Sequence, residues 1–296
     1  MKKKILLLIC LIALLSVVLV GCISKPPHKT FSDPWGNYEQ ITYDVTRTLG
    51  DTKYTGTSTI TTQRVNYANT DNKVTIGDRN LANFSGTVIT IDTALNDGST
   101  MFAKVAFKSS FEPVASYKKI HITGHEGFSP NKDINQISQI FYEDEKCKFS
   151  TNFDGVENSG ELKTGKWIKK PFYDNLMLYH IARSSYLDNN FTAITTSVLS
   201  ISDSKMKTLT ASITEANQLK KIFDNSEEVI KADVVKLSLN QSFPGSGKPM
   251  EVTISKEPET KDYCGITIPA NRVPLIISEG DMVYKIKSFT SEEPKA

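Results

Sequence analysis

The sequence predicts a mainly β fold, a twisted antiparallel sheet or half-barrel with at least one buried helix. Apolar and polar residues alternate over many segments, as expected of strands with one buried face. Thr, Ser and Tyr are abundant and Gly and Pro are scattered, a composition that suits half-exposed strands. One mid-chain segment, residues 171–185, is instead apolar around most of a helical circumference, and such a helix must be buried.

The predicted strands follow one another from residue 38. In residues 38–49, Ile41, Tyr43 and Val45 share one parity and the polar residues between them share the other. A Gly-Asp turn leads to a Thr-rich partner strand, and residues 89–95 and 103–107 form a hairpin around an Asn-Asp-Gly turn. We expect further strands at 137–143, 147–153, 160–167, 191–199, 207–214, 229–240, 249–256, 273–278 and 282–289.

Two segments break the alternation. Residues 171–185 begin with Pro171, which suits a first helical turn, and Asp174 lies early enough to favour the helix dipole. Residues 215–224 predict a second, short amphipathic helical turn. Four residues of the first helix are candidates for lining a groove that holds a lipid or another apolar ligand: Phe172, Leu176, Tyr179 and Arg183.

The amino terminus has the pattern of a secretory signal peptide. Three lysines precede an apolar run, residues 5–20, which is shorter than the roughly 20 residues that span a bilayer. The run ends in Leu19-Val20-Gly21-Cys22, which resembles the lipobox of bacterial lipoproteins at every position. That resemblance implies cleavage between Gly21 and Cys22 and a diacylglyceryl group on the Cys22 thiol. The alternative is an uncleaved short anchor with a chance cysteine.

Cleavage would change the charge of the chain. It removes 21 residues and three lysines, which leaves 32 basic residues against 33 acidic ones. A near-neutral mature chain gives no support for nucleic-acid binding. We therefore expect a lipid-anchored protein on the extracytoplasmic face of a bacterial cell membrane. Its parts would be a signal peptide (1–21), a lipidated cysteine with a flexible tether (22–36), a single β-rich domain (37–290) and a disordered tail (291–296).

The predicted domain also resembles an exported bacterial half-barrel family of unknown function, of the type called domain of unknown function 3108. The resemblance rests on the segment P-F-Y-D-N-L-M-L-Y-H-I-A-R, on Arg272-Val273-Pro274 and on the closing hairpin that ends at residues 282–289. It implies a half-barrel sheet. The insert-like region 111–135 departs from the pattern.

The histidines and glycine-rich segments do not form a known catalytic motif. His121 and His125 are four apart, but Gly124 lies between them and no third metal ligand is evident, so we predict no metal site. The segment 245–248 lacks the first glycine of a phosphate-binding loop and precedes a proline. His180 lies in the apolar helix, where a hydrogen-bonded core histidine is the simpler interpretation.

The acidic and sulfur-containing residues are also ambiguous. Glu143, Asp144 and Glu145 are adjacent, which favours a solvated turn over a pair of glycosidase carboxylates. Cys147 and Cys264 remain after cleavage, either as a disulfide or as two free half-buried thiols.

We predict no catalytic residue and no cofactor. The leading hypothesis is a non-enzymatic lipoprotein that binds an apolar or lipid ligand or has a structural role in the cell envelope. The alternatives are an envelope hydrolase with dispersed catalytic residues and a partner-binding module of an envelope complex.

Overall fold

The computed structural model describes residues 35–66, 74–124, 133–143, 146–163, 172–184, 194–200, 205–239, 249–270 and 272–292. The lipobox, most of the tether, His125 and the segment 245–248 lie outside these ranges. Among the residues described, no helix is both long enough and apolar enough to cross a membrane.

The described chain is mostly β-strand. One sheet of 15 strands has the order β10-β9-β8-β7-β6-β5-β2-β1-β19-β18-β15-β14-β13-β12-β11. Its neighbouring strands are antiparallel except for β11 and β12, which run parallel. The strands of the large sheet are β1 (Tyr38–Leu49), β2 (Thr52–Val65), β5 (Gly86–Leu95), β6 (Thr100–Phe107), β7 (Pro113–Ile122), β8 (Ile134–Tyr142), β9 (Lys146–Phe153), β10 (Val156–Lys163), β11 (Phe172–Tyr173), β12 (Ile194–Ser200), β13 (Lys205–Lys220), β14 (Ile230–Leu239), β15 (Met250–Ser255), β18 (Pro274–Glu279) and β19 (Met282–Glu292).

Two small hairpins and one helical segment complete the fold. The hairpins are β3 (Val74–Ile76) with β4 (Arg79–Leu81), and β16 (Lys261–Tyr263) with β17 (Ile266–Ile268). The helical segment is a 3₁₀ turn, η2 (Asn175–Met177), followed by α2 (Leu178–Ser184).

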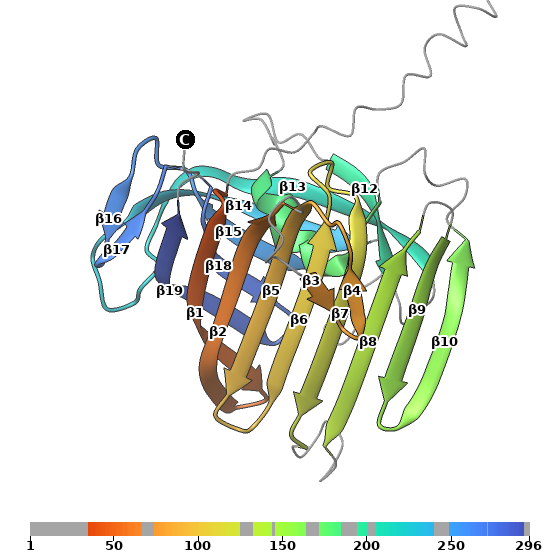
Figure 1. Cartoon of the computed structure of the whole chain (residues 1–296). Coiled ribbons are helices and arrows are strands. Elements are labelled where there is room, and N and C mark those ends of the chain that lie inside the picture. The colour runs from red at the N-terminus through yellow and green to blue at the C-terminus, as the bar shows by residue number, and fades with distance from the viewer. Residues whose placement is uncertain are drawn as a thin grey trace, which may run out of the picture.

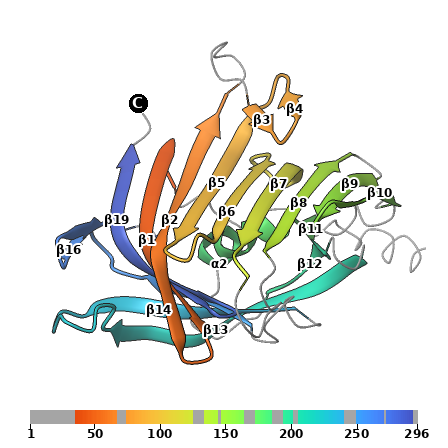
Figure 2. The ribbon, with the colours of Figure 1, turned by 90° about the horizontal axis from the view of Figure 1, so that it is seen from below.

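The sheet curves around the helical segment. Figure 1 shows β1 to β10 as a broad front layer, with β12 to β15 passing behind it. From below, α2 lies between the two layers (Figure 2). The end strands β10 and β11 are not hydrogen-bonded to each other, so the described sheet is open. Its two ends still approach, because Leu199 of β12 packs with Ile140 of β8 and Cys147 of β9.

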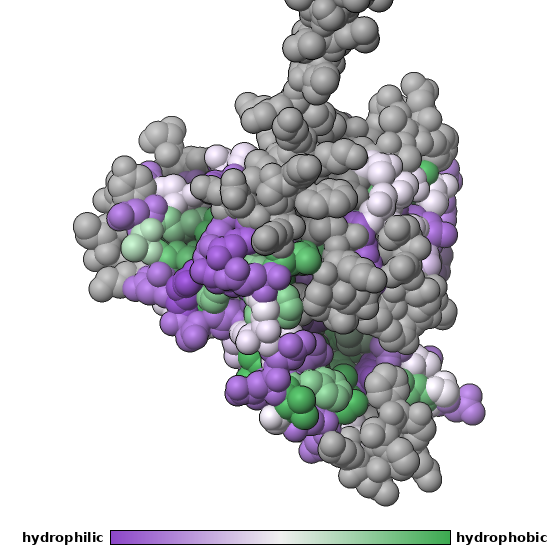
Figure 3. Space-filling view, turned by 90° about the vertical axis from the view of Figure 1, so that its right-hand side faces the viewer, coloured by the Kyte–Doolittle hydropathy of each residue, from purple (hydrophilic) through white to green (hydrophobic). Residues whose placement is uncertain are grey.

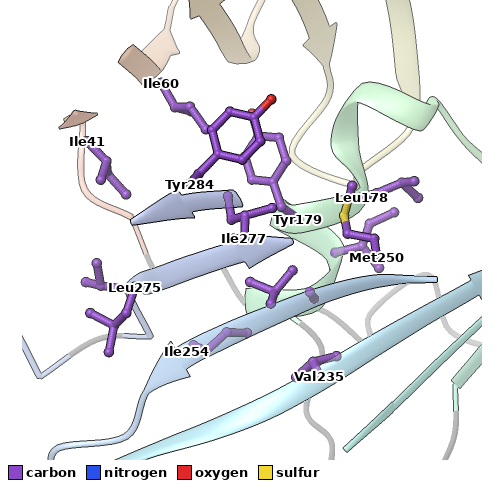
Figure 4. Close-up of a cluster of buried hydrophobic side chains, with 14 of the residues drawn as sticks. Ile41, Ile60, Leu178, Tyr179, Val235, Met250, Ile254, Leu275, Ile277 and Tyr284 are labelled. Atoms are coloured by element: carbon purple, nitrogen blue, oxygen red, sulfur yellow. The ribbon is translucent and has the colours of Figure 1, made fainter. Parts of the chain in front are cut away.

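The core fills the space between these layers. Residues on the concave face of both layers form one apolar cluster with Leu178, Tyr179 and Ile181 of α2. Figure 4 shows part of it, with Tyr179 beside Tyr284 and Ile277. A smaller cluster lies on the convex face, where Val74 and Ile76 of the β3–β4 hairpin pack with residues of β5 to β7.

The predicted mainly β, antiparallel character is confirmed, but several segments differ from expectation. The helix is shorter than 171–185, because Phe172 and Tyr173 pair with β12 and α2 has only seven residues. The predicted helical turn at 215–224 is wrong. Residues up to Lys220 extend β13, where two register shifts against β14 disturb the alternation that identifies a strand.

Three boundaries also change. The region 111–135 is insert-like in sequence, yet it contributes β7, an interior strand of the large sheet. Trp35, predicted in the tether, is 2% exposed and belongs to the core. Ser291 and Glu292, predicted in a disordered tail, pair with Glu39 and Tyr38 of β1.

Candidate functional site

A row of polar side chains crosses the concave face beneath the helical segment. Strand register places Glu39 of β1 beside Thr62 of β2, and carries the same row through Ile89 and Val105 to Ser116 of β7. Glu39, Thr62 and Ser116 are all buried. Each of the three bonds a different residue of the segment 174–184, so this row determines where the helical segment lies on the sheet.

Glu39 binds Arg183 at the end of α2. Arg183 donates from Nη1 to Oε1 at 2.5 Å and from Nη2 to Oε2 at 2.9 Å, a bidentate ion pair. Its Nε donates to the Arg272 carbonyl oxygen at 2.7 Å, and its guanidinium lies 5.6 Å from the ring centre of Trp35. The side chains of Arg183 and Glu39 are 0% and 1% exposed, so the pair has no contact with solvent.

Thr62 binds His180. Thr62 Oγ1 lies 2.8 Å from His180 Nε2, and the imidazole packs edge-on against the rings of Trp35 and Tyr179. Burial, and secondly the positive charge of Arg183, lower the pKa of His180 well below its ordinary value. His180 is therefore neutral at physiological pH. Its position confirms the interpretation as a hydrogen-bonded core histidine.

Ser116 binds Asp174, the residue that caps η2. Asp174 Oδ2 accepts hydrogen bonds from Ser116 Oγ and from Tyr142 Oη, both at 2.5 Å, and Oδ1 accepts one from the backbone N–H of Leu176 at 2.8 Å. Burial raises the pKa of Asp174, although these hydrogen bonds oppose the rise. The Asp174 carboxylate therefore caps η2 and also accepts hydrogen bonds from Ser116 of β7 and Tyr142 of β8.

This polar row has the form of a structural network. A catalytic nucleophile must reach its substrate, whereas Thr62 is 0% exposed and His180 is 1% exposed.

The predicted groove residues belong to the same buried region. Leu176, Tyr179 and Arg183 are at most 8% exposed and contact protein atoms, so they do not line an open groove as we expected. The side chain of Phe172 lies outside the described part.

The concave face continues beyond the helix as a second row of side chains. Register aligns Met101 of β6 with Ile120 of β7, Gln136 of β8, Phe153 of β9 and Val156 of β10. Exposure rises along the row, because Met101 and Ile120 are half-buried while Phe153 is 50% and Val156 is 71% exposed. We call these four apolar residues the apolar row.

Figure 3 views the molecule from the side of β10. Apolar residues form small separate areas among hydrophilic ones there, rather than one uniform apolar surface.

Two charged residues share the concave face with the apolar row. Lys118 of β7 is two residues from Ile120, on the same concave face, and aligns with Ala103 and Ser138. Glu279 ends β18 and aligns with Met282. Sequence reasoning missed these residues. For Glu279, its parity with the buried Ile277 on the same strand was a usable signal.

The remaining predicted residues do not form a site. His121 lies at the end of β7, 3.0 Å from Asn135 Oδ1 and 3.9 Å from Asp133 Oδ2, and within the described ranges no group of three metal-type ligands occurs. Glu143 is half-buried and pairs with Lys148 at 2.7 Å.

Both described cysteines are free, so the structure has two thiols and the predicted alternative of a disulfide is wrong. Cys147 is buried and its Sγ contacts the Leu162 carbonyl oxygen. Cys264 is half-buried near Ser226.

Comparison with known proteins gives one structural match. No family model and no curated protein matches the sequence. A crystal structure described as a β-barrel-like protein of Domain of Unknown Function DUF1849 from Brucella abortus is similar over 88% of this chain and 99% of its own, with a TM-score of 0.42 and 11% identity. A likeness at this level establishes neither a shared family nor a shared activity.

Proposed function

We propose that the protein is a lipid-anchored lipoprotein on the extracytoplasmic face of a bacterial membrane, with a non-enzymatic half-barrel domain that binds an apolar or amphipathic ligand. The observation that carries the ligand part is the apolar row on the concave face. Phe153 and Val156 expose half or more of their surface there, whereas the described residues of the main apolar cluster are buried. Covering exposed apolar side chains contributes about 25 cal/mol per Å².

The anchoring part rests on Leu19-Val20-Gly21-Cys22 and on its distance from the domain. Twelve residues lie between Cys22 and Trp35, the first described core residue, so the two are thirteen residue steps apart. A fully extended chain of that length reaches about 45 Å. The domain would then lie close to the bilayer, within reach of lipid.

The non-enzymatic part rests on how the polar groups of the core are engaged. Asp174, His180 and Arg183 each bond a residue of the polar row and have at most 1% exposure. Groups held in this way stabilise the sheet–helix contact and cannot touch a substrate.

Replacement of Cys22 tests the anchor. Cys22→Ser should abolish labelling by an alkyne fatty acid and leave a heavier, unprocessed precursor. Cys264→Ser is the matched control, because it removes a thiol of the domain and should leave labelling unchanged. Full labelling of the Cys22→Ser protein would refute the lipidation.

Extraction of the purified chain tests the ligand. Mass spectrometry of a solvent extract should find a co-purifying lipid, and a fluorescent fatty acid should bind to the stripped protein. Introducing charge into the apolar row with Phe153→Glu should weaken that binding, whereas Ile137→Glu on the convex face should not. If the stripped protein binds no amphiphile, the ligand function is excluded.

A further inference from the structure

We propose that the free edge of strand β10 binds an extended, basic segment of a partner protein, which adds to the sheet as one more strand. The proposal goes beyond the proposed ligand function, because it concerns the backbone groups at the end of the sheet. Three observations carry it: unpaired backbone groups along β10, an exposed apolar side chain at one end of that strand, and an unpaired carboxylate.

Strand β10 ends the large sheet. In the described sheet its eight residues pair only with β9, and that ladder has no bulge. Figure 1 shows β10 as the outermost strand of the front layer. Natural edge strands are commonly protected by proline, by a bulge, by charged side chains or by being very short. Of these protections β10 has only two carboxylates, so its outer side can pair with another strand.

The turn before β10 determines which backbone groups point outward. Asp154 and Gly155 have φ values of 49° and 86°, as in the two-residue turns that join tight hairpins, and Phe153 and Val156 flank them. Residues that flank such a turn exchange both backbone hydrogen bonds, and pairs of this kind alternate along an antiparallel ladder. The residues between these pairs, whose N–H and C=O groups point away from β9, are Glu157, Ser159 and Glu161.

The outward backbone groups are unpaired. Apart from the ladder with β9, no backbone hydrogen bond links Glu157, Ser159 or Glu161 to any residue of the described ranges. All three residues are exposed. A strand that adds beside β10 would pair with these groups, which is how many domains recognise extended peptides.

The side chains of β10 define the chemistry of the partner. On the concave side Val156 is 71% exposed and lies opposite Phe153, which is 50% exposed, so an apolar side chain of the partner would cover them. On the convex side Glu157 is exposed, and its carboxylate forms no ion pair with a described residue. Glu161 already pairs with Lys146 at 2.9 Å. The free carboxylate of Glu157 favours a basic side chain opposite it.

The partner segment should therefore alternate apolar and basic residues, because adjacent residues of a strand face opposite sides of the sheet. A second copy of β10 is a poorer partner. The register that pairs all three outward residues places Glu157 opposite Glu161 of the second copy, and like charges directly opposite destabilise a strand pair.

Fluorescence anisotropy of the full chain in detergent can measure this binding with a dye-labelled peptide in which lysine and valine alternate. A peptide of alternating glutamate and valine should bind at least about tenfold more weakly, because it repels Glu157. Glu157→Lys should reverse that preference. Glu259→Lys makes the same charge change at an exposed residue between β15 and β16 and should leave the preference unchanged.

Ser159→Pro tests the backbone hydrogen bonds. Proline lacks the N–H that Ser159 directs outward, whereas the ladder with β9 does not use that N–H, so an edge strand tolerates proline there. This variant should bind the lysine–valine peptide at least about tenfold more weakly. Ser159→Ala keeps the N–H and should bind as wild type does. Thermal unfolding of both variants should match wild type, which separates loss of the edge from loss of the fold.

Hydrogen exchange resolved to single amides locates the bound peptide. The lysine–valine peptide should slow exchange of the amides of Glu157, Ser159 and Glu161, and leave those of Asn158 and Gly160 unchanged.

Failure of the lysine–valine peptide to bind, protection elsewhere in the chain, or equal binding of both peptides would overturn the proposal. A wild-type dimer that Ser159→Pro dissociates would also overturn it, since the edge would then bind a second copy. Each of these results leaves the ligand function intact, because binding of a fluorescent fatty acid decides that separately.

Discussion

The ion pair between Glu39 and Arg183 should dominate the stability of the sheet–helix contact. Arg183→Met removes the guanidinium and leaves the Glu39 carboxylate at 1% exposure without a partner. Two charge-assisted hydrogen bonds to Glu39 and one to the Arg272 carbonyl oxygen are lost. Breaking a buried pair on one side costs about 3–5 kcal/mol, a large part of the 5–15 kcal/mol that typically stabilises a domain.

Urea unfolding followed by fluorescence measures this loss directly, because Trp35 lies against Arg183 and reports on the contact. We expect the free energy of unfolding of Arg183→Met to fall by about 3–5 kcal/mol. Replacing both charges in Glu39→Leu/Arg183→Met should recover most of the loss, since no charge is then left unpaired in the core.

An exposed ion pair on the same sheet provides the control. Lys287 and Asp44 lie 2.8 Å apart with side chains that are 51% and 60% exposed. Lys287→Met should cost less than about 1 kcal/mol, because solvent screens the pair. If Arg183→Met costs no more than Lys287→Met, the pair is not buried as described and the reasoning is wrong.

Two further predictions concern His180 and the cysteines. The pKa of His180 is lower in the folded protein than in the unfolded chain. Below about pH 6.5 the unfolded chain therefore binds a proton at this histidine that the folded protein does not bind. The free energy of unfolding should fall as the pH drops below that value, by at most about 1.4 kcal/mol per pH unit. His180→Gln, which retains a group to bond Thr62, should reduce that slope; an unchanged pH profile would contradict the assignment. Cys147 is buried and its pKa is raised to about 11, so iodoacetamide at pH 8 should alkylate the half-buried Cys264 first and reach Cys147 only after unfolding. Recovery of a Cys147–Cys264 disulfide from non-reduced protein would refute the free thiols.

Local alternation predicted the strands well but failed where a polar side chain faces the core. In β1 the buried parity predicted from Ile41, Tyr43 and Val45 is correct, yet Glu39 and Arg47 share that parity and are buried too. Their burial depends on Arg183 and Asp281, which lie 144 and 234 residues away in the chain. No local pattern contains that information.

The errors in the helical segments have a related cause. The segment 171–185 is apolar enough for a longer helix, but pairing of Phe172 and Tyr173 with β12 replaces its first turn. Residues 215–220 have a weak helical pattern, and pairing with β14 makes them a strand because tertiary contacts outweigh weak propensity.

The sequence by itself determined the mainly antiparallel β architecture, the buried nature of the 174–184 segment and the near-neutral charge that remains after the first 21 residues. These properties depend on period, composition and position, which are local. Only the tertiary structure decided that Glu39, Thr62 and Ser116 form one polar row under the helix, and that Cys147 and Cys264 stay unpaired. It also decided that Lys118, Glu279 and the apolar row share the concave face. Those relations arise from strand register and sheet curvature, which bring distant residues together by hydrogen bonding between strands.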